Sequence, residues 1–287
     1  MNVHRPQRNY GCRIHDQGTY LGMRTIVLEN DLVRVSYLLD KGADLFEFQY
    51  KPAGLDYVWL SENGVQNPNA YLPTSTDLIS TFIDYYPGGW QEVFPNGGPT
   101  SAYAVTQFGQ HGEVAHMRWD YTIVTDSVDC IAVTFSVRTK KVPFHLSRTV
   151  TLERQSPALT IQETLTNLSR VPLQFMWGQH VAFGKPFLEP GCRIVLPDSV
   201  EVLTETTDKD KPAAGRIARG RRHAWPLAES AGGGTVDLSV TPEPQTASDV
   251  VYLHGFGERG WYKVENERLG AGLHLEWDAS VMPYVWY

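Results

Sequence analysis

The stretch that decides the fold is IAVTFSVR, residues 131–138. Its apolar residues alternate with small or polar ones, which is the period-two pattern of a strand with one buried face. Strand-like segments lie before and after it, at residues 117–125, 144–152 and 159–166. Short turns separate these segments, and no helical pattern lies between them. We therefore predict a run of antiparallel strands in an all-β fold, because parallel strands need long, usually helical, crossovers.

Strand signals continue toward both ends of the chain. Residues 33–39 and 45–50 flank the turn Lys41-Gly42-Ala43-Asp44, which predicts a hairpin. Further strands are expected at residues 173–180, 249–253, 260–266 and 272–277. Without an internal repeat or an evident linker, we predict one domain over residues 1–287. The chain stops in the apolar segment 281–287, so we expect the last strand or strands of that domain to be missing.

Composition limits the classes of partner. The formal net charge is −7, whereas binding of nucleic acid or of an anionic membrane requires a basic face. The three cysteines are far apart and form no metal or redox motif, which indicates free thiols and a cytoplasmic location. No apolar run reaches the length that spans a bilayer. A truncated edge strand would favour association with a second chain, so a homodimer is one expectation.

Residues 51–110 form a long irregular segment, with a helical pattern only near residues 76–85. Such a segment inside a compact domain usually serves a function. Its centre is YPGGWQEVFPNGG, residues 86–98, where the glycines permit sharp turns. Trp90, Gln91 and Asn96 are candidates to face a polar, ring-shaped ligand. A tight structural loop over the core explains the same composition equally well.

Two histidines stand out from the nine in the chain. His111 lies in QHGEVAHMRW, residues 110–119, and His180 lies in MWGQHVAFG, residues 176–184. Each sits where a predicted strand meets glycine-containing sequence beside aromatic residues. Brought together, two imidazoles would support proton transfer near neutral pH. His116 is five residues after His111, so a regular strand would direct it to the opposite face.

Motifs for several other chemistries are not found. A zinc site would need three or four convergent ligands, but the sequence contains no HxH, HExxH or CxxC pattern, so we predict no metal site. There is no GxSxG of a serine hydrolase. Neither a phosphate-binding GxxxxGK[ST] nor a dinucleotide-binding GxGxxG occurs between a strand and a helix.

Taken in order, these motifs resemble those of the aldose 1-epimerase (galactose mutarotase-like) superfamily, and within it the bacterial epimerase-like branch. The resemblance runs from about residue 25 to the end of the chain. It rests on the loop GGWQEVFPNG, on His111-Gly112-Glu113, on WGQHVAFG and on SDVVY at residues 248–252. It implies a single large antiparallel β supersandwich that binds a sugar in a cleft on one concave sheet face.

The resemblance also implies roles for individual residues. His180 would protonate the ring oxygen of the sugar, His111 would hydrogen-bond the sugar, and Asp249 would hold sugar hydroxyls, without any cofactor. The family's base is a glutamate on a late strand, expected after the position at which this chain ends. Glu276 and Asp278 are the nearest carboxylates in the sequence and share one face of a strand by parity. They are the candidates for the base.

Three functions follow from these observations. The first is an aldose 1-epimerase-like isomerase that interconverts sugar anomers by acid/base ring opening. The second is a carbohydrate-binding or sensing protein without catalysis, which fits the unfilled position of the family's glutamate. The third is a sugar-phosphate mutarotase that uses Arg118 or a basic cluster formed by Arg216, Arg219, Arg221 and Arg222. A solvated loop is the alternative interpretation of that cluster.

Overall fold

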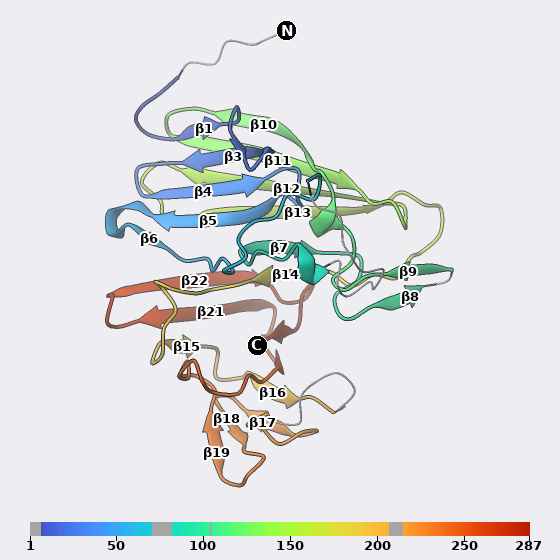
Figure 1. Ribbon diagram of the computed structural model, residues 1–287, viewed down its shortest axis with the longest axis vertical. Helices are drawn as coiled ribbons and strands as arrows, with labels where there is room; N and C mark the ends of the chain where they lie inside the picture. The colour runs from blue at the N-terminus through green and yellow to red at the C-terminus, as the bar shows by residue number, and fades with distance from the viewer. Residues whose placement is uncertain (1–6, 71–81, 104, 207–214) are drawn as a thin grey trace. The chain divides into compact units, whose positions relative to one another are not determined.

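The protein is described by a computed structural model that covers residues 7–70, 82–103, 105–206 and 215–287 (Figure 1). The chain divides into two compact units, residues 1–184 and residues 185–287. Each unit has its own sheets, as the strand pairing below shows. The single domain predicted over residues 1–287 stays a prediction.

The first sheet of the first unit contains eight antiparallel strands in the order β1-β3-β4-β5-β7-β14, with β2 paired to β3 and β6 to β5. Their bounds are β1 Arg13–His15, β2 Thr19–Tyr20, β3 Met23–Glu29, β4 Val33–Leu38, β5 Asp44–Tyr50, β6 Leu55–Asp56, β7 Trp90–Val93 and β14 Gly178–Val181. The predicted hairpin is confirmed as β4 and β5. Gly42 in its turn has φ +65°, and a Cβ there would lie 2.7 Å from the carbonyl oxygen of Ala115, so glycine is required.

The second sheet is the run of strands predicted around residues 131–138. It contains β10 Asp120–Asp126, β11 Cys130–Arg138, β12 Phe144–Glu153 and β13 Leu159–Asn167, paired antiparallel in chain order. Along β11 the apolar residues expected to face inward, such as Val133 and Phe135, are fully buried. The ring of Phe135 packs on that of Tyr37 from β4, with centroids 4.8 Å apart, so the two sheets face each other across an apolar core (Figure 1).

The connections of the first unit carry shorter elements. They are the 3-10 helices η1 Lys51–Ala53 and η2 Val114–His116, and the two-stranded sheet of β8 Ser101–Tyr103 and β9 Thr106–Phe108. The strand predicted at residues 173–180 begins only at residue 178. Most of the helix predicted near residues 76–85 lies outside the described residues, and its described end, residues 82–84, is helical.

The described residues of the second unit form three small sheets. The first is β15 Arg193–Val195, β21 Arg259–Asn266 and β22 Ala271–Asp278, and the second is β17 Arg222–Ala224, β16 Glu201–Thr204, β20 Val251–His254 and β23 Val285–Trp286. The third pairs β18 Leu227–Glu229 with β19 Thr235–Asp237. Strands β20, β21 and β22 confirm, within two residues at each end, the three strands predicted for this part of the chain.

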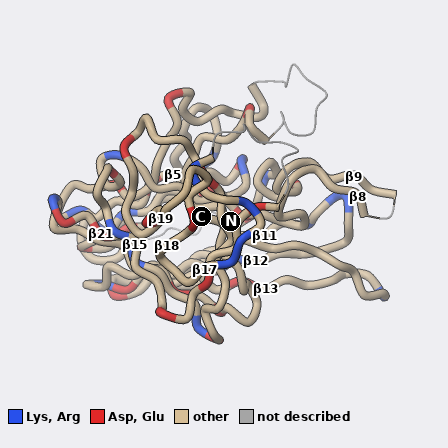
Figure 2. Tube along the Cα trace, turned by 90° about the horizontal axis from the view of Figure 1, so that it is seen from below, with Lys and Arg blue, Asp and Glu red and all other residues tan. Residues whose placement is uncertain are grey.

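Charged residues and cysteines are distributed as follows in the structure. Lys and Arg positions occur beside Asp and Glu positions over much of the trace (Figure 2). Ion pairs such as Arg13–Glu29 and Arg24–Asp40 account for several of these neighbours. All three cysteines are free thiols, with Cys12 and Cys192 buried. Within the described ranges, no helix has both the length and the apolar character needed to cross a membrane.

Candidate functional site

His180 is positioned by the pairing of β14 with β7. In this antiparallel ladder His180 lies opposite Gln91, and Gln179 lies opposite Glu92. Directly opposed residues point to the same face, and adjacent residues point to opposite faces. His180 and Gln91 therefore share one face of the sheet. Gln179 and Glu92 share the other, where the Gln179 amide donates to the Glu92 carboxylate at 2.8 Å.

His111 is positioned by a loop. Its backbone has φ +58°, an uncommon value for a residue other than glycine. Its backbone N–H donates to the carbonyl oxygen of Gly98 at 3.0 Å, and its ring Nδ1 lies 3.0 Å from that of Gly97. A Cβ on the next residue, Gly112, would lie 2.2 Å from the carbonyl oxygen of Phe94. Only glycine fits at position 112, so the close approach of this turn to Phe94 depends on the missing side chain.

Asn96 holds the same loop from inside. Its side chain is 3% exposed, and its amide group donates to the carbonyl oxygens of Gly98, Pro99 and Gly109 at 3.3, 2.7 and 3.1 Å. Its Oδ1 accepts a hydrogen bond from the hydroxyl of Ser101 at 2.9 Å. Asn96 was predicted to contact a ligand; the structure gives its polar atoms to the loop that carries His111.

The two histidines, 69 residues apart in the sequence, meet in the first unit. Their ring centroids are 5.2 Å apart, with the ring planes at 65°. The ring of Phe82 contacts both, at 4.5 Å from His111 and 6.1 Å from His180. The ring of Tyr86 lies 5.0 Å from that of His180, and its hydroxyl oxygen lies 3.3 Å from Nδ1 of His180. The expected convergence of the two imidazoles is therefore present, in aromatic surroundings.

These surroundings keep the histidines neutral. Burial, and then the neighbouring His111, lower the pKa of His180 to about 4. Burial also lowers the pKa of His111, while the hydrogen bond to the Gly97 carbonyl opposes that shift. An apolar environment disfavours the charged imidazolium. At neutral pH the pair presents uncharged imidazoles, each with one nitrogen that donates and one that accepts.

The position of His116 differs from the sequence expectation. The segment after His111 is not a strand, because residues 114–116 form the 3-10 helix η2. The rule of opposite faces therefore does not apply. The ring of Phe82 also packs against that of His116, with centroids 6.0 Å apart. Burial, followed by the charges of Lys41 and His111, lowers the pKa of His116 to about 4.

A buried ion pair lies on the first sheet where β5 begins. The Lys41 ammonium pairs with the Asp44 carboxylate, and their side chains are 0% and 1% exposed. The Gln91 amide donates to Asp44 at 2.8 Å, and burial raises the pKa of Asp44 above its ordinary value. Gln91 was predicted to contact a ligand. Its Oε1 is buried and has no hydrogen-bond partner among the described residues.

The opposite face of the first sheet carries a second polar cluster, which the sequence interpretation missed. The Gln179 amide donates to Glu163 of β13 as well as to Glu92. The indole N–H groups of Trp177 and Trp90 donate to Glu92 and to Gln179, respectively. Trp90 was predicted to contact the ligand, but it lies on this face, away from His180. The sequence did offer a signal for this cluster, because Glu92 and Glu163 are each the one charged residue in a strand of apolar or neutral residues.

The remaining predicted site residues lie in the second unit. The Asp249 carboxylate accepts two hydrogen bonds from Arg216, one from the backbone N–H and one from Nε, both at 2.7 Å. Glu276 forms an ion pair with Arg259, and Asp278 accepts hydrogen bonds from the backbone N–H and the hydroxyl of Ser280. The predicted roles of Asp249 in sugar binding, and of Glu276 or Asp278 as base, stay predictions.

The arginines considered for phosphate binding have carboxylate partners. Arg118 lies 2.8 Å from Asp40, and Arg216 pairs with Asp249 as described. In the basic cluster, Arg221 and Arg222 pair with Glu229 and Glu201. Arg221 and Arg222 are exposed beside these partners, and Arg222 begins strand β17 rather than lying in a loop.

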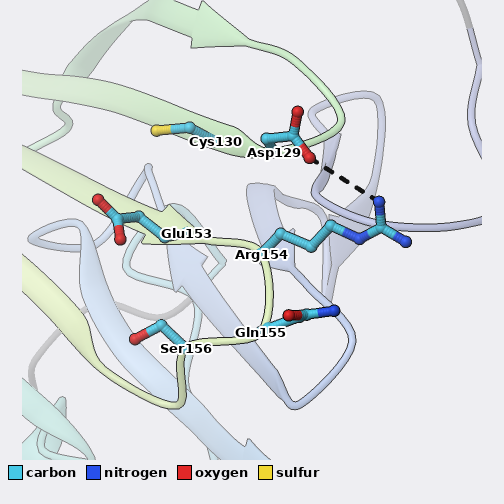
Figure 3. Close-up of a pocket in the computed structure, with 6 residues that line it drawn as sticks. All are labelled: Asp129, Cys130, Glu153, Arg154, Gln155 and Ser156. Atoms are coloured by element: carbon cyan, nitrogen blue, oxygen red, sulfur yellow. Dashed lines mark ion pairs between the residues drawn. The ribbon is translucent and has the colours of Figure 1, made fainter.

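A concavity of about 420 Å³ lies elsewhere in the first unit (Figure 3). Its lining residues lie around the start of β11, at the end of β12 and in the turn that follows β12. They are Asp129, Cys130, Glu153, Arg154, Gln155 and Ser156. Two of these residues, Asp129 and Arg154, form an ion pair 3.8 Å long (Figure 3). None of the predicted site residues lines this concavity. Over the described parts of the chain, no group of three or more His, Cys, Asp or Glu side chains could hold a metal ion.

Comparison with known proteins identifies the family. Residues 21–287 match the family model described as a domain of unknown function, DUF4432. The chain belongs to this family. Among curated proteins no match is found. The family description assigns no activity, so the solved structures provide the remaining comparison.

Solved structures with the same fold cover nearly the whole chain. A candidate aldose 1-epimerase from Klebsiella pneumoniae superposes with TM-score 0.68 at 14% identity, covering 96% of this chain and 69% of that one. A galactose mutarotase-like protein from Lactobacillus casei gives TM-score 0.54 at 17% identity, with 91% and 81% covered. A candidate aldose 1-epimerase from Escherichia coli gives 0.54 at 14%, with 92% and 77% covered. This member of DUF4432 therefore has the all-β, galactose mutarotase-like fold that the motifs predicted.

Proposed function

We propose that this protein is an aldose 1-epimerase-like isomerase that interconverts the anomers of a free sugar, with His180 and His111 at the anomeric centre. The observation that carries the proposal is the 5.2 Å separation of the two imidazole rings, which come from β14 and from the loop before η2. Ring opening requires a proton donor at the ring oxygen and a proton acceptor at the anomeric hydroxyl. Two adjacent imidazoles can supply both functions.

The names of similar structures support the same reaction class. The Klebsiella and Escherichia proteins are described as candidate aldose 1-epimerases, and the Lactobacillus protein as galactose mutarotase-like. The surroundings of the two histidines favour an uncharged sugar. They are the aromatic rings of Phe82 and Tyr86, and the nearby Lys41 is already paired with Asp44. A phosphate group would need an unpaired cation, and Arg118 is held by Asp40.

Polarimetry of freshly dissolved sugars tests this proposal. The wild type should accelerate the mutarotation of at least one of α-glucose, α-galactose and related hexoses, and His180→Gln should reduce that acceleration by about 100-fold or more. His111→Gln should also slow the reaction. Comparison of glucose with glucose 6-phosphate separates the free-sugar isomerase from the sugar-phosphate mutarotase. Equal rates for wild type and His180→Gln on every sugar would contradict catalysis at this site.

A carbohydrate-binding or sensing protein without catalysis is the second candidate. The observation that favours it is the depressed pKa of His180, since an imidazole that stays neutral at pH 7 is a weak acid. Isothermal calorimetry distinguishes the two candidates. Sugar binding that depends on His180 without any rate acceleration would support the binding protein. Acceleration that His180→Gln abolishes supports the isomerase.

A further inference from the structure

The hydrogen of the neutral His111 ring can be assigned from its contacts. Nδ1 lies 3.0 Å from the carbonyl oxygen of Gly97, and a carbonyl oxygen can only accept a hydrogen bond. Nδ1 therefore carries the hydrogen. In the neutral ring, Nε2 then has a lone pair, and the side-chain amide nitrogen of Gln110, a donor, lies 3.4 Å from it. His111 thus presents an acceptor at Nε2.

His180 has a different neighbour at the same position. Its Nδ1 lies 3.3 Å from the hydroxyl oxygen of Tyr86. Burial, and then the charge of Asp44, raise the pKa of Tyr86 to about 12, so the phenol keeps its hydrogen at neutral pH. The other polar contact found for this ring among the described residues is with the main chain of His180 itself, which opposes the fall in its pKa. Nε2, on the far side of the ring from the main chain, is the nitrogen left for a ligand.

Tyr86 is held in this position by packing. Its ring stacks on Phe82 with centroids 5.2 Å apart and planes at 24°, and the ring of Trp59 lies 6.3 Å away. The ring of His180 meets it edge-on, at 74°. These contacts involve only the ring, so removing the hydroxyl would leave them in place. The hydroxyl has a role separate from packing.

We propose that Tyr86 donates its hydroxyl hydrogen to Nδ1 of His180 and thereby holds the His180 hydrogen on Nε2. His180 is then a donor and His111 an acceptor, although they are the same residue type 5.2 Å apart. Resting on the proposed function, Tyr86, His180 and His111 form a proton relay for opening the sugar ring, in which Tyr86 acts through His180 as a positioning residue.

The relay balances without a cofactor. The anomeric hydroxyl takes the place of the Gln110 amide at Nε2 of His111 and gives its proton to that nitrogen. Its electron pair forms the C1=O1 bond while the C1–O5 bond breaks. O5 takes the hydrogen from Nε2 of His180, and Nδ1 of His180 takes the hydrogen from Tyr86. The result is an open-chain aldehyde sugar, a tyrosinate and a His111 imidazolium whose Nδ1–H is bonded to Gly97. Rotation about C1–C2 followed by the reverse transfers closes the other anomer and restores every group.

The relay explains how a neutral histidine could serve as the proton donor. Without a second proton, a neutral imidazole that gave up its Nε2 hydrogen would become an imidazolate. Taking the phenol hydrogen on Nδ1 avoids that anion and moves the charge to Tyr86. The two histidines therefore need opposite tautomers, which the Gly97 carbonyl and the Tyr86 hydroxyl provide.

Nitrogen-15 NMR of the substrate-free protein tests the tautomers directly. Resonances are assigned by comparison with His111→Gln and His180→Gln. At pH 7, His111 should carry its hydrogen on Nδ1 and His180 on Nε2, and Tyr86→Phe should shift His180 toward a mixture of tautomers. A His180 ring with hydrogen on Nδ1, donating to the Tyr86 oxygen or to its own main-chain carbonyl, would overturn the proposal. This measurement does not depend on any activity.

Kinetics of Tyr86→Phe tests the relay. Because the variant keeps the aromatic packing, kcat should fall by about 100-fold while KM changes by less than about threefold. Its residual rate should rise as the pH falls toward 4, where an imidazolium replaces the relay, whereas the wild type should not show that rise.

Tyr85→Phe is the matched control. It removes the hydroxyl of a neighbouring buried tyrosine for which no hydrogen bond to His180 is found. Equal kcat values for Tyr86→Phe and wild type would overturn the relay. A wild type inactive on every sugar would overturn the proposed function and the relay, whatever the tautomers.

Discussion

The amide of Gln179 donates to the carboxyl groups of both Glu92 and Glu163, although Glu92 lies on β7 of the first sheet and Glu163 on β13 of the second. Glu92 is fully buried, and Arg148 of β12 lies 3.4 Å from it. Burial and then the charge of Glu92 raise the pKa of Glu163 to about 10. Glu163 therefore keeps its proton at neutral pH, because burial and a nearby carboxylate both disfavour its charged form.

This pair predicts a pH-dependent stability. Glu163 keeps its proton up to about pH 10 in the folded state but loses it near pH 4.5 when unfolded. The unfolded state therefore binds fewer protons, and stability falls as the pH rises from about 4.5 to about 10. Glu163→Gln should flatten this decline and raise the melting temperature at pH 8. Thermal melts from pH 5 to 9 measure it, with the exposed Glu153→Gln as control. An unchanged slope in Glu163→Gln would contradict the raised pKa of Glu163.

For His116 we expect the opposite effect on stability, which should fall as the solution becomes more acidic. Its pKa of about 4 in the folded state is below the ordinary 6.5, so the unfolded state binds more protons between these values. Its contribution to stability is present above pH 6.5 and is lost as the pH falls toward 4. His116→Leu should reduce the difference in free energy of unfolding between pH 7.5 and 5. Urea titrations at the two pH values, compared with the exposed His15→Leu, test this. Equal differences for wild type and His116→Leu would show that His116 is protonated in the folded protein.

The turn after His111 predicts a strict requirement for glycine. Alanine at position 112 would place its Cβ 2.2 Å from the Phe94 carbonyl oxygen, at φ +83°. Gly112→Ala should destabilise the fold by roughly 1–3 kcal/mol or more and displace His111. Gly178→Ala is the matched control beside His180, because a Cβ there meets no atom within 4 Å. Urea titration and mutarotation rates should show a large loss in the first variant and little change in the second.

Asn96 predicts an indirect effect on the candidate site. Asn96→Ala leaves the carbonyl oxygens of Gly98, Pro99 and Gly109 without their side-chain donor. The expected cost is about 1–3 kcal/mol of stability, because buried polar groups lose a partner. The His111 tautomer signal should broaden as its loop loosens. Ser101→Ala removes only the hydroxyl that donates to Asn96 and should have a smaller effect on both measurements. An unaffected His111 signal in Asn96→Ala would contradict this role.

We expect the two C-terminal carboxylates, Glu276 and Asp278, to have little effect on the mutarotation rate. Glu276 is exposed and paired with Arg259, and Asp278 accepts hydrogen bonds within its own turn from Ser280. If the base is His111, Glu276→Gln and Asp278→Asn should each change the mutarotation rate by less than about twofold. Polarimetry on the two variants, with His111→Gln as the positive control, measures this. A loss of about 100-fold in either one would restore that carboxylate as the base.

Much of the architecture was predictable from local pattern. The alternation in residues 131–138 and in the segments around it predicted β10 to β13, because a sheet with one buried face imposes a period of two on the sequence. The turn at residues 41–44 predicted the β4–β5 hairpin, because a glycine-containing turn lies between two strand-like segments. The strand expected at residues 173–180 was too long at its start. Phe175 and Met176 are exposed before β14 begins, so the apolar run there indicated neither burial nor strand pairing.

The candidate site was predictable only in part. The sequence indicated His111 and His180 through their flanking glycines and aromatics. It could not show that Trp90 and Gln91, adjacent in the chain, would point to opposite faces of β7, with only Gln91 on the side of His180. It also missed Tyr86, Glu92 and Glu163, because their partners come from distant segments.

The sequence by itself determined the all-β class, the run of strands around residues 131–138 and the two candidate histidines, since each of these depends on residues near one another in the chain. The tertiary structure alone decided that the histidines meet at 5.2 Å, that burial keeps them neutral, and that Gly97 and Tyr86 contact equivalent nitrogens of the two rings. Proton positions depend on which distant donor or acceptor reaches a ring, and on how much water is excluded there. Both are properties of the packed molecule.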